Sequence, residues 1–175
     1  MTKLLGISGS LRKGSYNSML VREAARIFAP DEFAFADMNL PLFNEDVEAE
    51  GIPEPVQRIS QQILDADAIV MSTTEYNKGP SGVMKNMLDW VSRPRPAPMV
   101  GKPVAVLSAA AGAAGGQRAK SNMYLYLIPF KVKLVYQSEV NVGGAGSKFD
   151  ENGRLTDEAS EQALERLMAE LKAEI

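Results

Sequence analysis

The chain has 175 residues, of which 45% are hydrophobic and 23% are charged, and its formal net charge at pH 7 is -3. This size and composition indicate one globular domain spanning residues 1–175, and the mild charge without a long basic run argues against nucleic acid as a partner. The sequence contains neither Cys nor His, which excludes a thiolate nucleophile, a Ser–His–Asp hydrolase and the commonest metal ligands, so we expect no metal site.

The chain opens directly on a strand-like run, without the pattern of a signal peptide. No apolar stretch approaches the roughly 20 residues that a membrane-spanning helix needs. We therefore expect a cytoplasmic protein with no membrane partner, whose chemistry depends on carboxylates, Tyr, Lys, Arg or a bound cofactor.

Strand and helix patterns alternate five times along the chain. Strands are predicted at 4–7, 33–36, 68–72, 103–108 and 132–136, and helices at 18–29, 54–66, 83–91, 117–127 and from about 156 to the C-terminus. The first helix has Asn17 or Ser18 as its expected N-cap, and residues 38–53, 93–98 and 142–153 are expected to be irregular. This pattern predicts a flavodoxin-like α/β fold, with a five-stranded parallel sheet in the order 2-1-3-4-5 and helices on both faces.

In such a sheet, ligands bind beyond the carboxyl ends of the strands. Three loops of unusual composition leave these ends, after the strands at 4–7, 68–72 and 103–108. We therefore expect the three loops to form one composite site.

The first loop is rich in Gly and Ser and leads into a helix, an arrangement that binds a phosphate monoester through backbone N–H groups and hydroxyls. Its side-chain donors are Ser8, Ser10, Arg12, Ser15, Asn17 and Ser18. Gly9 and Gly14 have the spacing of a P-loop, but Ser15 stands where the P-loop Lys belongs, which argues against nucleoside triphosphate hydrolysis. A plain turn is the alternative.

The second loop, residues 73–82, contains Gly79 and Gly82, which let backbone amides approach a flat ligand closely. Its Tyr76 could instead be a half-buried aromatic, and its Glu75 a solvated carboxylate.

The third loop, residues 109–116, has only Ala and Gly and predicts a smooth wall, a flexible lid or a mobile connector.

The motifs in these loops resemble those of the NADPH-dependent FMN reductase family, and they follow one another in the same order over nearly the whole chain. They are Gly6-x-Ser8-Gly9-Ser10-Leu11-Arg12 with Ser15-x-Asn17; Glu75-Tyr76-Asn77 with Pro80, Gly82, Lys85-Asn86 and Asp89-Trp90; and Gly115-Gly116-Gln117-Arg118-Ala119. Thr74 stands where the family usually has Pro, and Ser81 separates Pro80 from Gly82. Both departures bear on the fit around the flavin ring.

The resemblance implies an oxidoreductase that holds FMN non-covalently. Ser8, Ser10, Arg12, Ser15, Tyr16, Asn17 and Ser18 would surround its phosphate, Thr74, Glu75, Tyr76, Asn77 and Lys78 would lie along its ring, and Ser108, Gly112 and Gly115 would close the other side. NADH or NADPH would reduce FMN in a ping-pong cycle. FMN would then reduce a small-molecule acceptor: a quinone, chromate, a ferric complex, an azo compound or free flavin.

Three expectations keep alternatives open. Arg95 would contact the nicotinamide nucleotide, or it would be a solvated arginine in a stiff loop. The family often forms homodimers or homotetramers, for which Trp90, Tyr124 or Tyr126 would supply contacts or else belong to the core. The alternative function is a flavodoxin-type electron carrier without direct NAD(P)H oxidation; the Gly/Ala loop and the mild charge favour the enzyme.

Overall fold

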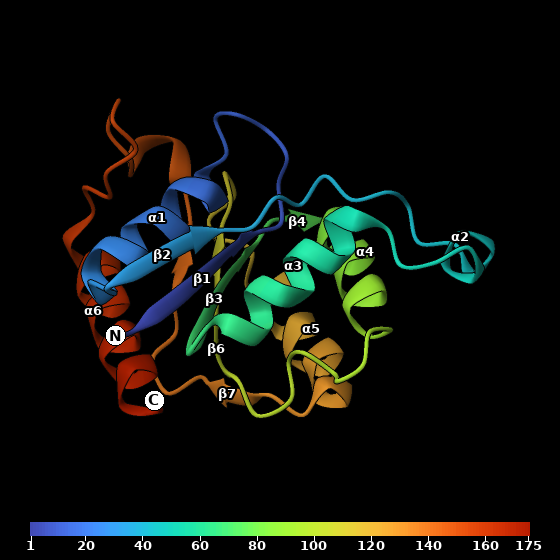
Figure 1. Ribbon diagram of the computed structural model, residues 1–175. Coiled ribbons are helices and arrows are strands. Elements are labelled where there is room, and N and C mark those ends of the chain that lie inside the picture. Colours follow the sequence, from blue (N-terminus) through green and yellow to red (C-terminus); the bar gives the residue numbers. More distant parts are fainter.

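The computed structural model describes residues 1–175 and confirms the predicted α/β architecture (Figure 1). Its parallel sheet has the order β2-β1-β3-β6-β7. The strands are β1 (Lys3–Ser8), β2 (Glu32–Phe35), β3 (Ala68–Thr73), β6 (Pro103–Ala109) and β7 (Lys133–Val135). This is the order expected from the sequence, with β6 and β7 as the fourth and fifth strands.

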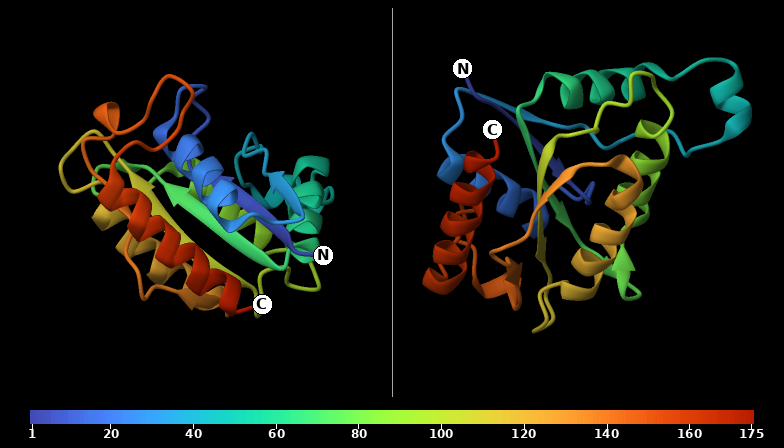
Figure 2. Two further views of the ribbon diagram at one scale, coloured as in Figure 1. Left: turned by 90° about the vertical axis from the view of Figure 1, so that its left-hand side faces the viewer. Right: turned by 90° about the horizontal axis from the view of Figure 1, so that it is seen from below.

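The sheet is covered on both faces. Helices α1 (Tyr16–Phe28) and α6 (Glu158–Ala173) pack side by side on one face, and α3 (Glu54–Asp65), α4 (Gly82–Val91) and α5 (Gln117–Leu127) pack on the other (Figures 1 and 2). Val70 and Leu107 belong to the core under α1 and α6, whereas their neighbours Ile69 and Val106 belong to the opposite core. Because each face of a strand is buried, the strands are apolar throughout.

Gly6 lies where helix α1 and strand β2 approach β1 most closely. A Cβ atom at this position would lie 2.5 Å from Val21 Cγ1 and 2.9 Å from the Phe33 ring. No side chain fits here without a shift of both neighbours, so this glycine fixes the distance between helix and sheet.

The fifth strand is interrupted, which the sequence pattern did not reveal. After β7 the chain leaves the sheet and returns as β8 (Asn141–Val142), which pairs with the end of β6. Between the two pieces, the Ser138 hydroxyl and N–H donate to the Glu170 carboxylate of α6, at 2.6 and 3.0 Å. These bonds replace the strand pairing that a continuous strand would make.

Other differences concern short elements. Helix α1 begins at Tyr16, and its N-cap is Ser15 rather than Asn17 or Ser18, because the Ser15 hydroxyl accepts a bond from the Ser18 N–H. Helix α2 (Glu45–Ala49) lies in a stretch that was expected to be irregular. Two single turns of 3₁₀ helix, Ile128–Phe130 and Ala145–Ser147, lie in the C-terminal half of the chain. Strands β4 (Glu75–Tyr76) and β5 (Gly79–Pro80) form a hairpin within the second loop.

The segment that carries α2 extends away from the sheet (Figure 1). It is held against α4, where the Pro41 carbonyl accepts bonds from Asn86 Nδ2 at 2.9 Å and from Trp90 Nε1 at 2.8 Å. The Phe43 ring meets the Trp90 ring edge-on at 4.9 Å between centroids. Trp90 is fully buried and therefore belongs to the core. None of the helices has the length and apolar character that a membrane-spanning segment needs.

Gly6→Ala is expected to lower the free energy of unfolding by about 1–3 kcal/mol, because the added methyl group overpacks the contact with Val21. Urea denaturation followed by circular dichroism measures it. Gly82→Ala is the control, since a Cβ there meets nothing within 4 Å. The urea concentration at the unfolding midpoint of this variant should not fall. Equal stability of the two variants would contradict the close approach.

Candidate functional site

The three loops predicted from composition meet at the carboxyl ends of β1, β3 and β6, where they enclose a cavity of about 300 Å³. The residues that line it are Ser10, Arg12, Ser15, Tyr16, Asn17, Thr74, Glu75, Tyr76, Ala109, Ala110, Ala111 and Gly112. Each loop contributes to the lining, so the composite site expected from the strand order is present as one open cavity.

Asn17, in the first turn of α1, binds the ends of β3 and β6 through its side chain. Its Oδ1 atom accepts bonds from Ser72 Oγ at 2.8 Å and from the Ala109 N–H at 3.0 Å, and its Nδ2 atom donates to the Ala109 carbonyl at 2.9 Å. The side chain is buried, and these bonds use its amide group. This side chain holds the strand ends in place, and the expected contact of Asn17 with a phosphate stays a prediction.

The first loop presents unpaired donors at the start of α1. The N–H groups of Tyr16 and Asn17 have no partner in the protein, as expected for the first turn of a helix. Arg12 is exposed beside them, and the Ser10 hydroxyl accepts a 3.3 Å bond from the Arg12 N–H. Unpaired N–H groups at a helix N-terminus beside an exposed cation are the arrangement that favours an anion.

Ser8 and Ser18 were also predicted to contact the phosphate, but they do not line the cavity. Their hydroxyls bond to each other at 2.8 Å, and Ser8 is buried. Sequence reasoning missed Ser81, whose hydroxyl caps α4 and donates to the Gly9 carbonyl at 2.6 Å. The residue that departs from the family motif thus ties the second loop to the first.

The second loop is a hairpin with Asn77 and Lys78 at its tip, where φ is +51° and +67°. Two successive positive φ values are typical of a type I′ turn, which favours Asn and Gly at these positions. Tyr76 is exposed and lines the cavity, so it is not a half-buried core aromatic. Asn77 and Lys78 lie at the rim and outside the cavity lining.

Glu75 connects the second loop to the third. Its Oε2 atom accepts bonds from the N–H groups of Arg118 and Ala119, at 3.1 and 3.2 Å. These are the N–H groups of the second and third residues of α5, whose own N-cap, Gly116, has no side chain to satisfy them. Glu75 is therefore a helix cap supplied by a distant strand, not a freely solvated carboxylate.

The third loop is fixed by hydrogen bonds to the segment around β8. The Ala110 N–H donates to the Val142 carbonyl at 3.0 Å, and the Ala110 carbonyl accepts from the Ala145 N–H at 3.1 Å. The backbones approach so closely that a Cβ on Gly143 would lie 2.1 Å from the Ala113 carbonyl oxygen. Of the alternatives that composition left open, the geometry favours a wall.

Ser108 and Gly115 lie behind this wall rather than in the cavity. The buried Ser108 hydroxyl donates to Asn141 Oδ1 at 2.9 Å. Gly115 has φ +60° and packs against the backbone at Asn141, where a Cβ would lie only 2.6 Å from the carbonyl carbon. Only Gly112 of the two predicted glycines faces the cavity.

Arg95 does not reach the three loops. It lines a separate cavity beyond the C-terminal end of α4, whereas the N-terminal end of that helix adjoins the second loop. Its Nη1 atom donates to the carbonyls of Ser92, Arg93 and Pro94. Within one chain the length of α4 separates Arg95 from the three loops, and its expected contact with the nicotinamide nucleotide stays a prediction.

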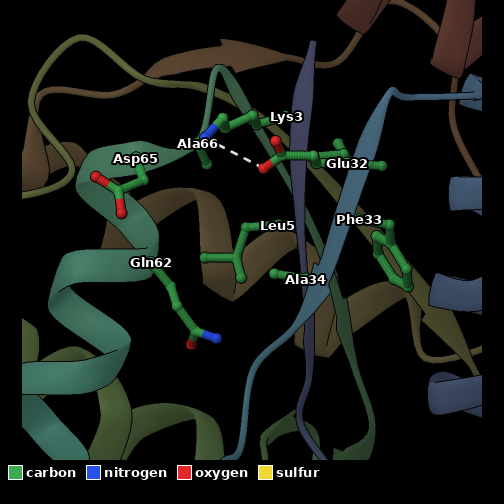
Figure 3. A pocket seen from close by; sticks show the side chains of 9 residues that line it. Lys3, Leu5, Glu32, Phe33, Ala34, Gln62, Asp65 and Ala66 are labelled. Carbon is green, nitrogen blue, oxygen red and sulfur yellow. Dashed lines mark ion pairs between the residues drawn. The ribbon is translucent and has the colours of Figure 1, made fainter. Parts of the chain in front are cut away.

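A larger cavity of about 370 Å³ lies at the amino ends of β1 and β2, next to α3 (Figure 3). Two of its charged groups form an ion pair, in which Lys3 Nζ lies 3.1 Å from Glu32 Oε2. Ligands of doubly wound sheets bind at the opposite, carboxyl edge. We therefore place the functional site in the smaller cavity, where unpaired N–H groups converge.

Lys120 is the one buried cation near the site. Its Nζ atom has no hydrogen-bond partner and lies 3.6 Å from the exposed Glu139 carboxylate. Burial lowers the pKa of Lys120 below its ordinary value of 10.5, and Glu139 partly offsets this. Burial also raises the pKa of the neighbouring Tyr124 to about 12.

Comparison with known proteins gives one consistent picture. The model of the NADPH-dependent FMN reductase family matches residues 2–147. An NAD(P)H-dependent FMN reductase of Pseudomonas aeruginosa is 42% identical over 172 residues, covering 97% of this chain and 93% of that protein. A quinone reductase of Escherichia coli K12 is 32% identical, covering 98% of this chain and 92% of its own. The solved structure of FerB from Paracoccus denitrificans, a flavoenzyme NAD(P)H:(acceptor) oxidoreductase, has a TM-score of 0.89 at 27% identity and covers 99% of this chain and 96% of its own.

Asn17→Ala is expected to destabilise the fold by about 3 kcal/mol, because it leaves the buried Ala109 N–H and Ser72 hydroxyl without partners. Chemical denaturation of the ligand-free protein measures this loss. Asn39→Ala is the matched control, since that exposed side chain makes no hydrogen bond, and it should stay within about 0.5 kcal/mol of wild type. A cost at position 17 no larger than at position 39 would contradict the bridging role.

Lys120→Met is expected to raise the free energy of unfolding at pH 7 by about 1–2 kcal/mol, because it removes a buried charge that has no hydrogen-bond partner and only a 3.6 Å ion pair with the exposed Glu139. The folded protein holds this proton less tightly than the unfolded chain, so the penalty is full below the folded pKa and fades as pH rises toward 10.5. Denaturation at several pH values should therefore show the gain of the variant narrowing in alkali. A stability gain of the variant that increases with pH would contradict the lowered pKa of Lys120.

Proposed function

The chain belongs to the family of NADPH-dependent FMN reductases, and from this premise we propose that it is an FMN-dependent NAD(P)H:acceptor oxidoreductase. The observation that supports this most directly is the meeting of three loops around one cavity with unpaired N–H groups. A chain with no His and no Cys offers few groups for covalent or acid–base chemistry. A bound flavin would supply the hydride transfer, and the protein would supply position and electrostatics.

The residues at the start of α1 fit the phosphate of FMN. The N–H groups of Tyr16 and Asn17 would donate to its oxygens, and Arg12 would add a charge-assisted bond. The hydroxyls of Ser10 and Ser15 line the same part of the cavity. The donor set thus combines main-chain amides, hydroxyls and one cation, which is the chemistry that a phosphate monoester requires.

The other two loops fit a flat ring. Thr74, Glu75 and Tyr76 line one side of the cavity, and Ala109–Gly112 lines the other with almost no side-chain volume. The N–H groups of Ala111 and Gly112 have no partner in the protein. They would donate to polar atoms at the ring edge and stabilise negative charge that develops there on reduction. The wall leaves space above the ring for a second ligand.

We propose quinones as acceptors, by analogy with relatives such as a 2-hydroxy-1,4-benzoquinone reductase of Burkholderia sp. that is 34% identical over 170 residues. Chromate, ferric complexes, azo compounds and free flavin are further acceptors to test. An open cavity walled by backbone makes few specific contacts above the ring, which favours a broad range of small acceptors.

A homodimer or homotetramer is part of the proposal. Leu125 and Ile128, at the end of α5, are 63% and 65% exposed, and Tyr126 lies between them. Such a group of exposed apolar side chains favours a protein contact. Trp90, which was a candidate for this contact, is buried in the core and does not support it. We also propose a cytoplasmic location, because nicotinamide nucleotides are found there.

The purified protein should be yellow, or should become so with added FMN, and excess NADH or NADPH without oxygen should bleach it within seconds to minutes. Absorbance near the flavin band measures this, and a quinone should restore the colour. An FMN complex that neither nucleotide bleaches would instead support the electron-carrier alternative. Failure to bind FMN would contradict both functions.

Arg12→Ala is expected to weaken FMN binding about 10-fold, because a charge-assisted bond of roughly 1.5–3 kcal/mol is lost at a partly solvated site. Fluorescence quenching of FMN titrated with apoprotein measures the affinity. Arg22→Ala is the matched control, since Arg22, on α1, lies over the ring of Phe35 in β2 and does not line the cavity. An equal effect of the two substitutions would contradict the role of Arg12.

A further inference from the structure

The rim of the cavity carries four cations without ion pairs, although the chain as a whole is acidic. Arg12 and Lys13 lie on the first loop, and Lys78 and Arg118 lie across the cavity on the hairpin tip and the start of α5. All four side chains are exposed, and none forms a salt bridge within the chain. Many other cations are paired, including Lys3, Lys85, Arg93 and Lys148. Unpaired cations around one cavity attract an anionic ligand.

The hairpin that carries Lys78 packs against α5, which carries Arg118 in its first turn. The Lys78 carbonyl accepts a 3.2 Å bond from Asn122 Nδ2, one helical turn after Arg118 on α5. Glu75, on the same hairpin, accepts the bond from the Arg118 N–H at 3.1 Å. These bonds fix the backbone that carries the two cations to one side of the second loop.

The backbone at Lys78 gives a second, independent indication. This residue has φ +67°, a conformation that costs a residue with a side chain about 1–2 kcal/mol and costs glycine nothing. Glycine is the favoured residue at this position of a type I′ turn. An exposed Lys that makes no ion pair is thus present at a position of the turn that favours Gly.

We infer that Lys78 and Arg118 bind a phosphate group of the reducing dinucleotide, an inference that rests on the proposed function. The first loop is occupied by the FMN phosphate in that proposal, so its cations are already used. The nicotinamide ring must enter the cavity to meet the flavin, and the rest of the dinucleotide must then lie across the rim. Lys78 and Arg118 are the cations that this part of the ligand would meet, and Arg provides the planar donors that a phosphate accepts.

A dinucleotide offers two kinds of phosphate, the diphosphate common to NADH and NADPH and the 2′-phosphate of NADPH alone. An Arg near the ribose is the usual means of accepting a 2′-phosphate. The pair would discriminate between the two reductants only if it meets the 2′-phosphate. Comparing the two nucleotides on the same variant therefore identifies the phosphate.

The test is the double variant Lys78→Ala/Arg118→Ala of the FMN-loaded protein. Binding of NADP⁺ and NAD⁺ is measured by isothermal titration calorimetry, and the KM and kcat for NADPH and NADH are measured at low and high salt. The matched control is Lys133→Ala/Arg166→Ala, which also removes one Lys and one Arg, both exposed and without ion pairs, from β7 and α6. It corrects for the general loss of positive charge.

The double variant should raise the KM for NADPH about 10-fold, weaken NADP⁺ binding similarly, leave kcat nearly unchanged and reduce the salt dependence of KM. A loss of affinity confined to NADPH and NADP⁺ assigns the pair to the 2′-phosphate. An equal loss of affinity for NADH and NAD⁺ assigns it to the diphosphate. Unchanged affinities, or losses equal to those of the control variant, would overturn the inference. If neither nucleotide reduces the flavin of the wild-type protein, the proposed function itself fails instead.

Discussion

The buried amide group of Asn17 is the interaction on which the site depends. It lies at the start of α1 and binds the ends of β3 and β6 at once, through Ser72 and Ala109. Three segments that are far apart in the sequence are thereby fixed at one point of the sheet edge. A buried amide group must find hydrogen-bond partners, and the ends of β3 and β6 supply them here. The cavity is the space left around this junction.

Around Asn17, each loop is held by a group from another loop. Ser81 fastens the second loop to the first, Glu75 fastens it to the third, and the backbone near β8 holds the third loop. The donors that remain unpaired are therefore fixed before any ligand arrives, which lowers the entropy cost of binding. The same cross-links explain why a loop of Ala and Gly forms a wall, although its composition alone would also suit a flexible connector.

The sequence predicted the sheet well and the roles of individual side chains poorly. Strands covered on both faces are apolar throughout, so their positions and order were readable from local patterns. The roles of Asn17 and Glu75 depend on which distant backbone groups lie beside them, and only the register of β1, β3 and β6 decides that. Arg95 was placed by analogy and lies elsewhere. The interruption between β7 and β8 depends on a contact with Glu170, which no local pattern announces.

The wall formed by Ala109–Gly112 and its anchoring segment has a consequence for how the chain tolerates mutation. The groups of this wall that we propose to bind the flavin ring are main-chain N–H groups, and every residue except proline retains them. Point mutations in this wall can therefore alter the shape of the space above the ring while the grip on the ring itself persists. A change in length is different, because an inserted or deleted residue shifts the amides out of register with Val142 and Ala145. We therefore expect substitutions in this wall to change which acceptors fit, and insertions to weaken binding of the cofactor.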